Sequence, residues 1–152
     1  MVRRALIGIA AALVPGVAAL GEEIVASKNF IAFVSEPTTA EITAARRAAR
    51  ALFAKAEGAG FPIVARVART NSTTLISLES VAISERAKGC PLLVFRDITA
   101  DPVLKTNAFQ NAVLDYRDGA TYLLLRVWDK VSECRISDVA KARCHPVKPP
   151  AR

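Results

Sequence analysis

Residues 38–62 read TTAEITAARRAARALFAKAEGAGFP, and this stretch predicts the helix around which the rest of the chain is organised. Thr38 and Glu41 have the spacing of a capping box, in which a hydroxyl and a carboxylate satisfy free backbone N–H groups. Apolar residues then recur at intervals of three and four, which places them on one face of a helix. They are Ile42, Ala45, Ala49, Leu52, Phe53 and Ala56. Gly58 and Gly60 end the pattern, because glycine tolerates the left-handed turn that closes a helix. We therefore predict one long helix over residues 39–57.

The start of the chain has the features of a secretory signal peptide. A segment with two arginines is followed by an uncharged run over residues 5–21, which ends in small residues. We predict cleavage after Gly21, with cleavage after Ala19 as the alternative. A membrane-spanning helix needs ~20 apolar residues, whereas this run has 17 and Pro15 interrupts it. The chain is therefore predicted to be exported to the periplasm or the extracellular space, with no transmembrane segment after cleavage.

Length and charge describe the part that remains after cleavage. Of the 152 residues, 131 would remain, a length typical of one domain. The net charge of +7 falls to +5, because the leader carries two arginines and no acidic residue. This charge permits contact with an anionic partner. We predict a single domain over residues 22–144 and a disordered, Pro-rich basic tail over residues 145–152.

The three cysteines are interpreted through the predicted export, because exported proteins meet an oxidising compartment. We favour a disulfide between Cys134 and Cys144, since the intervening segment is short. Closing that loop would stabilise the fold by about 2.8 kcal/mol on the chain-entropy model. Cys90 would then be a buried free thiol, although a pairing of Cys90 with either of the other two stays open.

Most of the remaining sequence predicts strands. The expected strands are residues 29–34, 61–69, 74–84, 91–96 and 121–128, the first of them covered on both faces. Residues 101–117 fit a helix that begins after Asp101, but their last part also fits a strand that enters a hairpin turn at Asp118. Residues 137–143 predict a short final helix. The fold class is therefore α+β: one long N-terminal helix packed on a mostly antiparallel sheet of about five or six strands, with a short C-terminal helix.

No motif of enzyme or metal chemistry is present. The single histidine, His145, lies next to Cys144 in a spacing that matches no common zinc or haem motif. A nucleophile elbow and a glycine-rich phosphate loop are both missing. We therefore predict no catalytic residue, no metal ligand and no cofactor.

Four aspartates offer one alternative. Asp97 and Asp101 flank a short connection, and Asp115 and Asp118 bracket the start of the expected hairpin. Paired carboxylates can catalyse hydrolysis when a cleft holds them several ångströms apart. Aspartate is also common in turns for local reasons, so an exported hydrolase is the alternative and not the main interpretation.

Two groups of residues indicate binding. Arg46, Arg47 and Arg50 lie opposite the apolar stripe of the helix and suggest a patch for an anionic partner, although a solvated helix face is the simpler interpretation. Tyr122 and Trp128 share strand parity with an arginine and could line a groove. We predict a small exported, non-catalytic binding, inhibitor or envelope-accessory protein. Its partner would be an anionic envelope component or another exported protein, and not nucleic acid; a carrier of a small apolar ligand is a further alternative.

Overall fold

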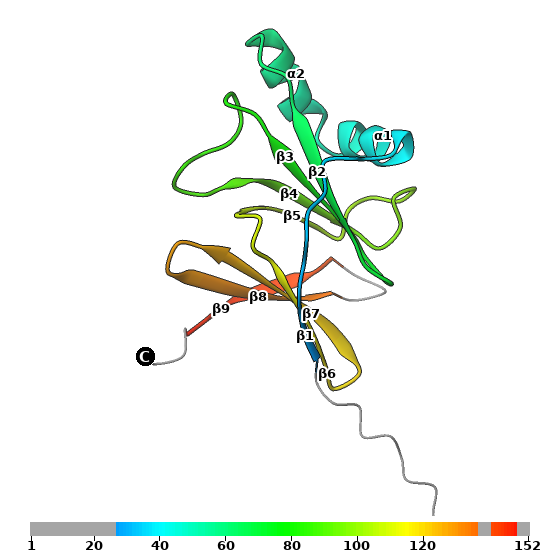
Figure 1. The fold of residues 1–152 in the computed structure, drawn as a ribbon, viewed down its shortest axis with the longest axis vertical. Helices are drawn as coiled ribbons and strands as arrows, with labels where there is room; N and C mark the ends of the chain where they lie inside the picture. The colour runs from blue at the N-terminus through cyan, green and yellow to red at the C-terminus, as the bar shows by residue number, and fades with distance from the viewer. Residues whose placement is uncertain (1–26, 137–140, 149–152) are drawn as a thin grey trace, which may run out of the picture.

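The computed structural model describes residues 27–136 and 141–148, which form three layers (Figure 1). Two short helices cover a four-stranded sheet, and that sheet packs on a five-stranded sheet. The helices are α1 (Thr39–Ala48) and α2 (Arg50–Gly58). The four-stranded sheet has the order β2 (Val64–Arg69), β3 (Thr74–Glu79), β4 (Cys90–Phe95), β5 (Leu104–Ala108). The five-stranded sheet has the order β1 (Ser27–Phe30), β6 (Val113–Arg117), β7 (Ala120–Val127), β8 (Lys130–Ile136), β9 (Arg143–Val147). Every pairing is antiparallel, so the α+β class is confirmed, but the single predicted sheet is two sheets.

The predicted long helix is broken at Ala49. The capping box is present, because Thr38 Oγ1 accepts from the Glu41 N–H and Glu41 accepts from the Thr38 N–H. In an unbroken helix the Leu52 N–H would bond to the Ala48 carbonyl; it donates instead to the Ala49 carbonyl at 2.9 Å. Lys105 Nζ of β5 takes the Ala48 carbonyl at 2.6 Å. A side chain from the sheet thus satisfies the backbone group that the break leaves free.

Both helices still use the predicted apolar stripe. All six residues of this stripe pack in one core, and the side of the four-stranded sheet that faces the helices forms the rest of that core. The strands of that sheet are buried on both faces, so neighbouring residues enter different cores: Ile76 packs against the helices and Leu75 against the five-stranded sheet. The break therefore preserves the burial that the pattern predicts while it changes the helix direction.

The strand predicted at residues 29–34 is shorter and less buried than expected. Among the residues that the structure describes, β1 pairs only with β6 and lies at the edge of the five-stranded sheet. Phe30 is 87% exposed, because its side of that sheet has no covering layer among the described residues. The apolar sequence predicted a covered central strand, and this part of the prediction is wrong.

Residues 101–117 contain strands and no helix. β5 and β6 occupy this segment, and residues 118 and 119 form the predicted hairpin turn between β6 and β7. Asp118 and Gly119 both have positive φ, 51° and 67°, as a two-residue turn of this kind requires.

The end of the chain differs most from the predictions. β8 was not predicted, and β9 replaces both the end of the predicted helix and the start of the predicted tail; residues 137–140 lie outside the described part. β9 pairs along its length with β8, and the pair Cys134 and Cys144 lies in register within it. The sheet therefore continues past residue 144, the predicted domain end.

The predicted leader, residues 1–21, also lies outside the described residues. Within the described part, no helix is long and apolar enough to cross a membrane.

Candidate functional site: the outer face of the five-stranded sheet

The five-stranded sheet has one buried and one open face. Leu114, Leu123 and Cys134 point inward and pack against the other sheet. Side chains alternate along each strand, so the residues between them point to the opposite side. Both helices and the four-stranded sheet lie on the inner side (Figure 1), and no described element covers the outer side.

The outer face consists of three rows, of which two cross the sheet from β1 to β9 and the third spans β7 to β9. Strand register defines them, because directly paired residues share a face. The first row is Lys28, Asp115, Tyr122, Arg135 and Arg143. The second row is Phe30, Val113, Leu124, Glu133 and His145. The third row is Arg126, Val131 and Val147. Arg117 lies on the same face, two residues beyond Asp115.

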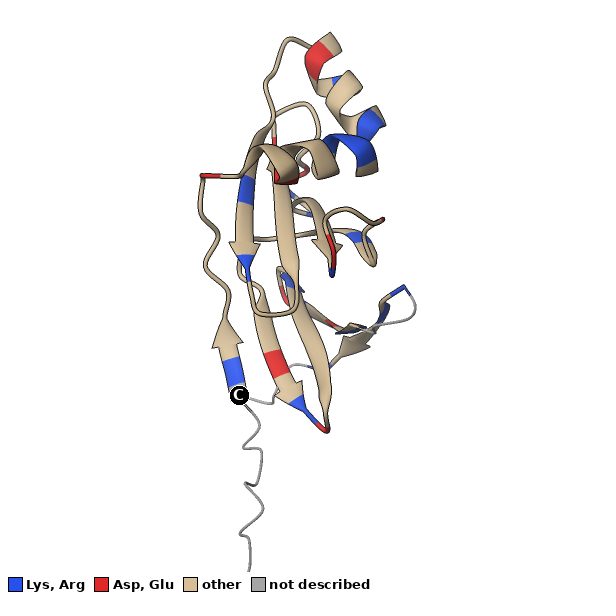
Figure 2. Cartoon of the chain, turned by 90° about the vertical axis from the view of Figure 1, so that its right-hand side faces the viewer, with Lys and Arg blue, Asp and Glu red and all other residues tan. Residues whose placement is uncertain are grey.

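The accessible charges on this face are positive. Lys28, Arg126, Arg135 and Arg143 are exposed and come from four different strands. The two carboxylates of the same rows are buried instead: Asp115 is 1% exposed and Glu133 is 7% exposed. Exposed positive charge thus extends from β1 at one edge of the sheet to β9 at the other. Figure 2 marks the Lys and Arg positions on the ribbon, both in the strands and at the junction of the two helices.

Arg117 holds both buried carboxylates. Its guanidinium lies 3.0 Å from Asp115 Oδ2 and 2.5 Å from Glu133 Oε1, and it stacks over the Tyr122 ring at 4.1 Å. The hydrogen bond that Arg117 donates to Glu133 raises the pKa of Arg117, and burial opposes this only in part. Asp115 Oδ1 has no hydrogen-bond partner among the described residues. The half-buried Arg117, which lies over the Tyr122 ring, therefore pairs with both buried acids.

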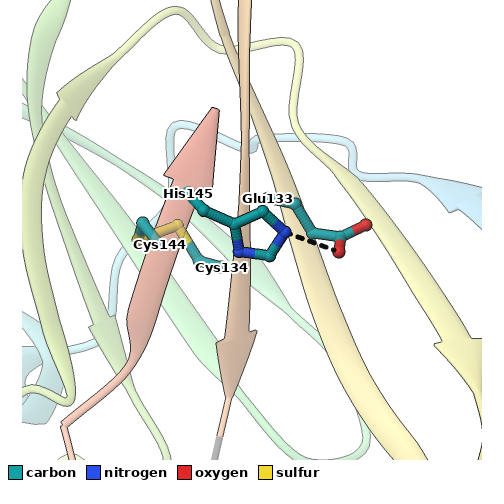
Figure 3. The surroundings of a disulfide bond; sticks show 4 residues. All are labelled: Glu133, Cys134, Cys144 and His145. Atoms are coloured by element: carbon teal, nitrogen blue, oxygen red, sulfur yellow. Dashed lines mark ion pairs between the residues drawn. A yellow bond between two sulfur atoms is a disulfide. The ribbon is translucent and has the colours of Figure 1, made fainter. Parts of the chain in front are cut away.

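A disulfide fixes the β9 side of the face. Cys134 and Cys144 are opposed in register, are bonded as predicted, and have their Cα atoms 3.9 Å apart. His145 follows directly and turns outward, with Nε2 3.4 Å from Glu133 Oε1 (Figure 3). The disulfide thus holds the strand that carries Arg143 and His145. Cys90 is a half-buried free thiol whose Sγ accepts from Ser84 Oγ at 3.0 Å.

The aromatic residues noted in the sequence lie at two places. Tyr122 is on the outer face, with Leu124 and Arg126 on the same strand. Trp128 follows the end of β7, where φ is 57° and the ring packs edge-on against Phe109 at 5.4 Å. Arg126 Nε donates to the Trp128 carbonyl at 2.6 Å. The sequence predicted Tyr122 and Trp128 on one face of a strand, but Trp128 lies beyond the end of β7.

Arg46, Arg47 and Arg50 line one shallow pocket of about 360 Å³ between the helices. Arg46 pairs with Glu57 at 2.7 Å and lies over Phe53, and Arg47 donates to the carbonyls of Ile98 and Ala100. Arg50 is exposed and makes no side-chain hydrogen bond or ion pair within the described residues. Two of the three arginines thus have intramolecular roles, and the anionic partner of this patch stays a prediction.

The four aspartates occupy different settings. Asp97 accepts two hydrogen bonds from Thr99, which lower its pKa, and Asp101 is exposed in the same β4–β5 connection. Asp118 is in the β6–β7 turn. Asp115 meets Glu133 through Arg117, a pairing that sequence reasoning missed because it depends on β8. Within the described ranges no group of three or more His, Cys, Asp or Glu could hold a metal ion.

Comparison with known proteins finds no matching protein-family model, no similar curated protein and no similar solved structure.

Proposed function

We propose that this chain is a small exported, non-catalytic binding protein that recognises an acidic partner through the outer face of the five-stranded sheet. The observation that carries the proposal is the separation of charge on that face. Four cationic side chains reach solvent, and the two carboxylates are buried under Arg117. Such a surface attracts an acidic partner and repels a second copy of itself.

The composition of the face favours a protein partner over a simple polyanion. Arginines outnumber lysines there, and Phe30 and Tyr122 add aromatic surface. Arginine and aromatic residues are enriched in protein interfaces, whereas lysine is depleted. Val113, Leu124 and Val131 are half-buried between the cations and supply apolar contact area. An acidic exported protein with some apolar surface is therefore the expected partner.

The disulfide supports the exported location. Disulfides persist in oxidising compartments and are rare in the cytosol, and Cys134–Cys144 holds one edge of the proposed face. The proposal thus joins the predicted export and the binding surface in one mature protein.

Charge reversal tests the proposal. In the face variant, Glu replaces Arg126, Arg135 and Arg143 together. In the matched variant, Glu replaces Lys55, Arg86 and Lys88, which are exposed outside this face. Each immobilised protein is exposed to the exported proteins of its host, to polyglutamate and to phosphatidylglycerol vesicles, at low and at physiological salt. We expect the wild type and the matched variant to retain acidic proteins that salt releases, and the face variant to lose at least about tenfold in affinity.

Two outcomes would contradict the proposal. Equal loss in both variants would show that net charge, and not this face, governs binding. Retention of vesicles alone, with no acidic protein, would make a membrane surface the partner.

A further inference from the structure

The break between α1 and α2 leaves a groove beside the edge strand β5. Its volume is about 340 Å³, at the lower end of the ~300–1,000 Å³ of small-molecule sites. Residues 48–52 of the helices line one side of the groove, and residues 91–93 and 105–107 of β4 and β5 line the other side. This groove is separate from the outer face described above, since it lies on the helix side of the four-stranded sheet.

The floor of the groove is apolar. Leu93 and Ala49 are buried members of the core between helices and sheet, and Leu52 packs against them while remaining half-buried. Pro91 extends this surface along β4. A short hydrocarbon chain would find aliphatic contacts along the whole floor.

The rim carries polar groups with spare hydrogen-bonding capacity. Lys105 and Asn107 pair in register with Leu93 and Pro91, so both point to the helix side. Lys105 Nζ donates to the Ala48 carbonyl at 2.6 Å. An ammonium has three donors, and the other two have no partner among the described residues. The half-buried Asn107 amide has no side-chain hydrogen bond within the part of the chain that the structure describes.

Arg50 completes the rim from the first residue of α2. It is two residues beyond the carbonyl that Lys105 contacts, and it is the helix-junction arginine without an intramolecular side-chain partner among the described residues. No acidic residue lines the groove. An apolar floor with two cations and an amide at its edge is complementary to a molecule with an apolar body and one anionic end.

We propose that this groove binds a small amphiphile that carries a carboxylate on a short apolar chain. The carboxylate lies between Arg50 and Lys105, and the chain lies along Pro91, Leu93 and Leu52. This function goes beyond recognition of an acidic protein, because it uses another surface and another class of ligand.

A set of matched ligands tests the proposal by calorimetry on the folded, oxidised protein. Decanoate, used below its micelle concentration, should bind saturably with one molecule per chain. Decanol should bind at least about tenfold more weakly, the scale of a lost charge-assisted hydrogen bond. Acetate and decyltrimethylammonium should show no saturable binding, because one lacks the chain and the other has the wrong charge.

Two variants separate the charged rim from the apolar floor. Arg50→Gln should weaken decanoate about tenfold and leave decanol unchanged, whereas Asn107→Trp, which fills the groove, should abolish both. Arg86→Gln, at an exposed position outside both the groove and the outer face, is the matched control and should change neither. Far-UV circular dichroism confirms that each variant is folded.

The proposal would be overturned if wild-type protein fails to bind decanoate saturably, or binds decyltrimethylammonium equally well. It would also be overturned if Arg50→Gln and Asn107→Trp both leave decanoate affinity unchanged. These results are independent of acidic-protein binding, because that measurement uses the outer face of the five-stranded sheet.

Discussion

Glu41 connects a helix to a sheet through one buried carboxylate. It accepts from the Thr38 N–H at 2.6 Å and from Arg69 of β2 through two contacts of 2.7 Å. The hydrogen bond with Arg69 is the main reason that the pKa of Glu41 lies below its usual 4.5; the Thr38 groups add to it, and burial opposes it. The capping box that begins α1 is therefore also the contact that positions α1 over the four-stranded sheet.

The lowered pKa predicts how stability depends on pH. Because the carboxylate is favoured in the folded state, its contribution is fully present above the unfolded pKa and is lost as pH falls through the lower folded pKa. We expect Glu41→Gln to reduce the free energy of unfolding by about 1–3 kcal/mol at neutral pH and to flatten its decline below about pH 5. Urea unfolding from pH 7 to pH 2 measures both. Asp101→Asn, at an exposed position, should behave like the wild type; a parallel decline in Glu41→Gln would contradict the assignment.

Of the glycines that the structure describes, Gly89 leaves the least room for a side chain. Its φ is +85°, and an added Cβ would lie 2.4 Å from the Ala108 carbonyl oxygen of β5. We expect Gly89→Ala to destabilise the protein by more than the ~1–2 kcal/mol of a left-handed conformation alone, because backbone must also move. Gly119 also has positive φ, but an added Cβ would meet no atom there, so Gly119→Ala should lower the free energy of unfolding by about 1–2 kcal/mol. Gly58 has open space and no positive φ, so Gly58→Ala should be neutral or stabilising. Thermal unfolding of the three variants tests this order, and an equal loss in all three would contradict it.

At the scale of elements, β9 depends on one covalent bond. Within the described residues it is an edge strand that pairs only with β8, and four of its five residues are exposed. Burial of its side chains therefore contributes little to its stability. The Cys134–Cys144 bond, across ten positions of sequence, limits how far the strand can separate from β8.

Reduction of this bond should loosen β9 selectively. We expect the free energy of unfolding to fall by about 2–3 kcal/mol, and amide hydrogen exchange to rise in β9 far more than in β6 and β7. A Cys90→Ala background prevents exchange with the free thiol, and its oxidised form is the control. Unchanged exchange in β9 after reduction would show that backbone pairing alone holds the strand.

The elements differ in how well the sequence predicts them. The start of α1, the apolar stripe and the 118–119 turn follow from local patterns and are present. The break at Ala49 has no local signal, and Lys105, whose side chain satisfies the Ala48 carbonyl there, is distant in sequence. β8 was missed although its residues alternate between the two faces, since Glu133 and Arg135 resemble a polar connection until their partners are known.

At the scale of the whole molecule, two cores share the four-stranded sheet. Val67 and Ile76 belong to the core with the helices, and Ala68 and Leu75 to the core between the sheets. Removing contacts in one core therefore weakens strands on which the other core depends.

This sharing predicts a single unfolding transition. Trp128, in the β7–β8 turn, reports on the five-stranded sheet, and circular dichroism at 222 nm reports mainly on the helices. We expect both signals to coincide in urea, and Ile76→Ala and Leu75→Ala each to cost about 2–5 kcal/mol while the signals remain coincident. A substitution on the open face, Val131→Ala, should cost much less. Separate midpoints would show that the two sheets unfold independently.

The candidate sites are properties of the whole molecule, which explains why the sequence predicted them only in part. The rows on the outer face draw residues from five strands, so their charge pattern exists only once every register is known. The sequence located Arg50, but Lys105 and Asn107 join it through β5, a segment whose conformation was ambiguous. Catalytic motifs can be local in sequence, whereas a sheet face cannot.

The pairing of β1 with β6 has a consequence for how the chain reaches this structure. Ser27 lies opposite Tyr116, so the two partners are separated by most of the described sequence. Closing so long a loop is entropically costly, and folds dominated by such distant contacts form slowly. On a chain that emerges N-terminus first, residues 27–30 lack their β6 partner until residues 113–117 have followed. We expect β1 to dock late and to be the segment most in need of protection from aggregation while the protein is being made.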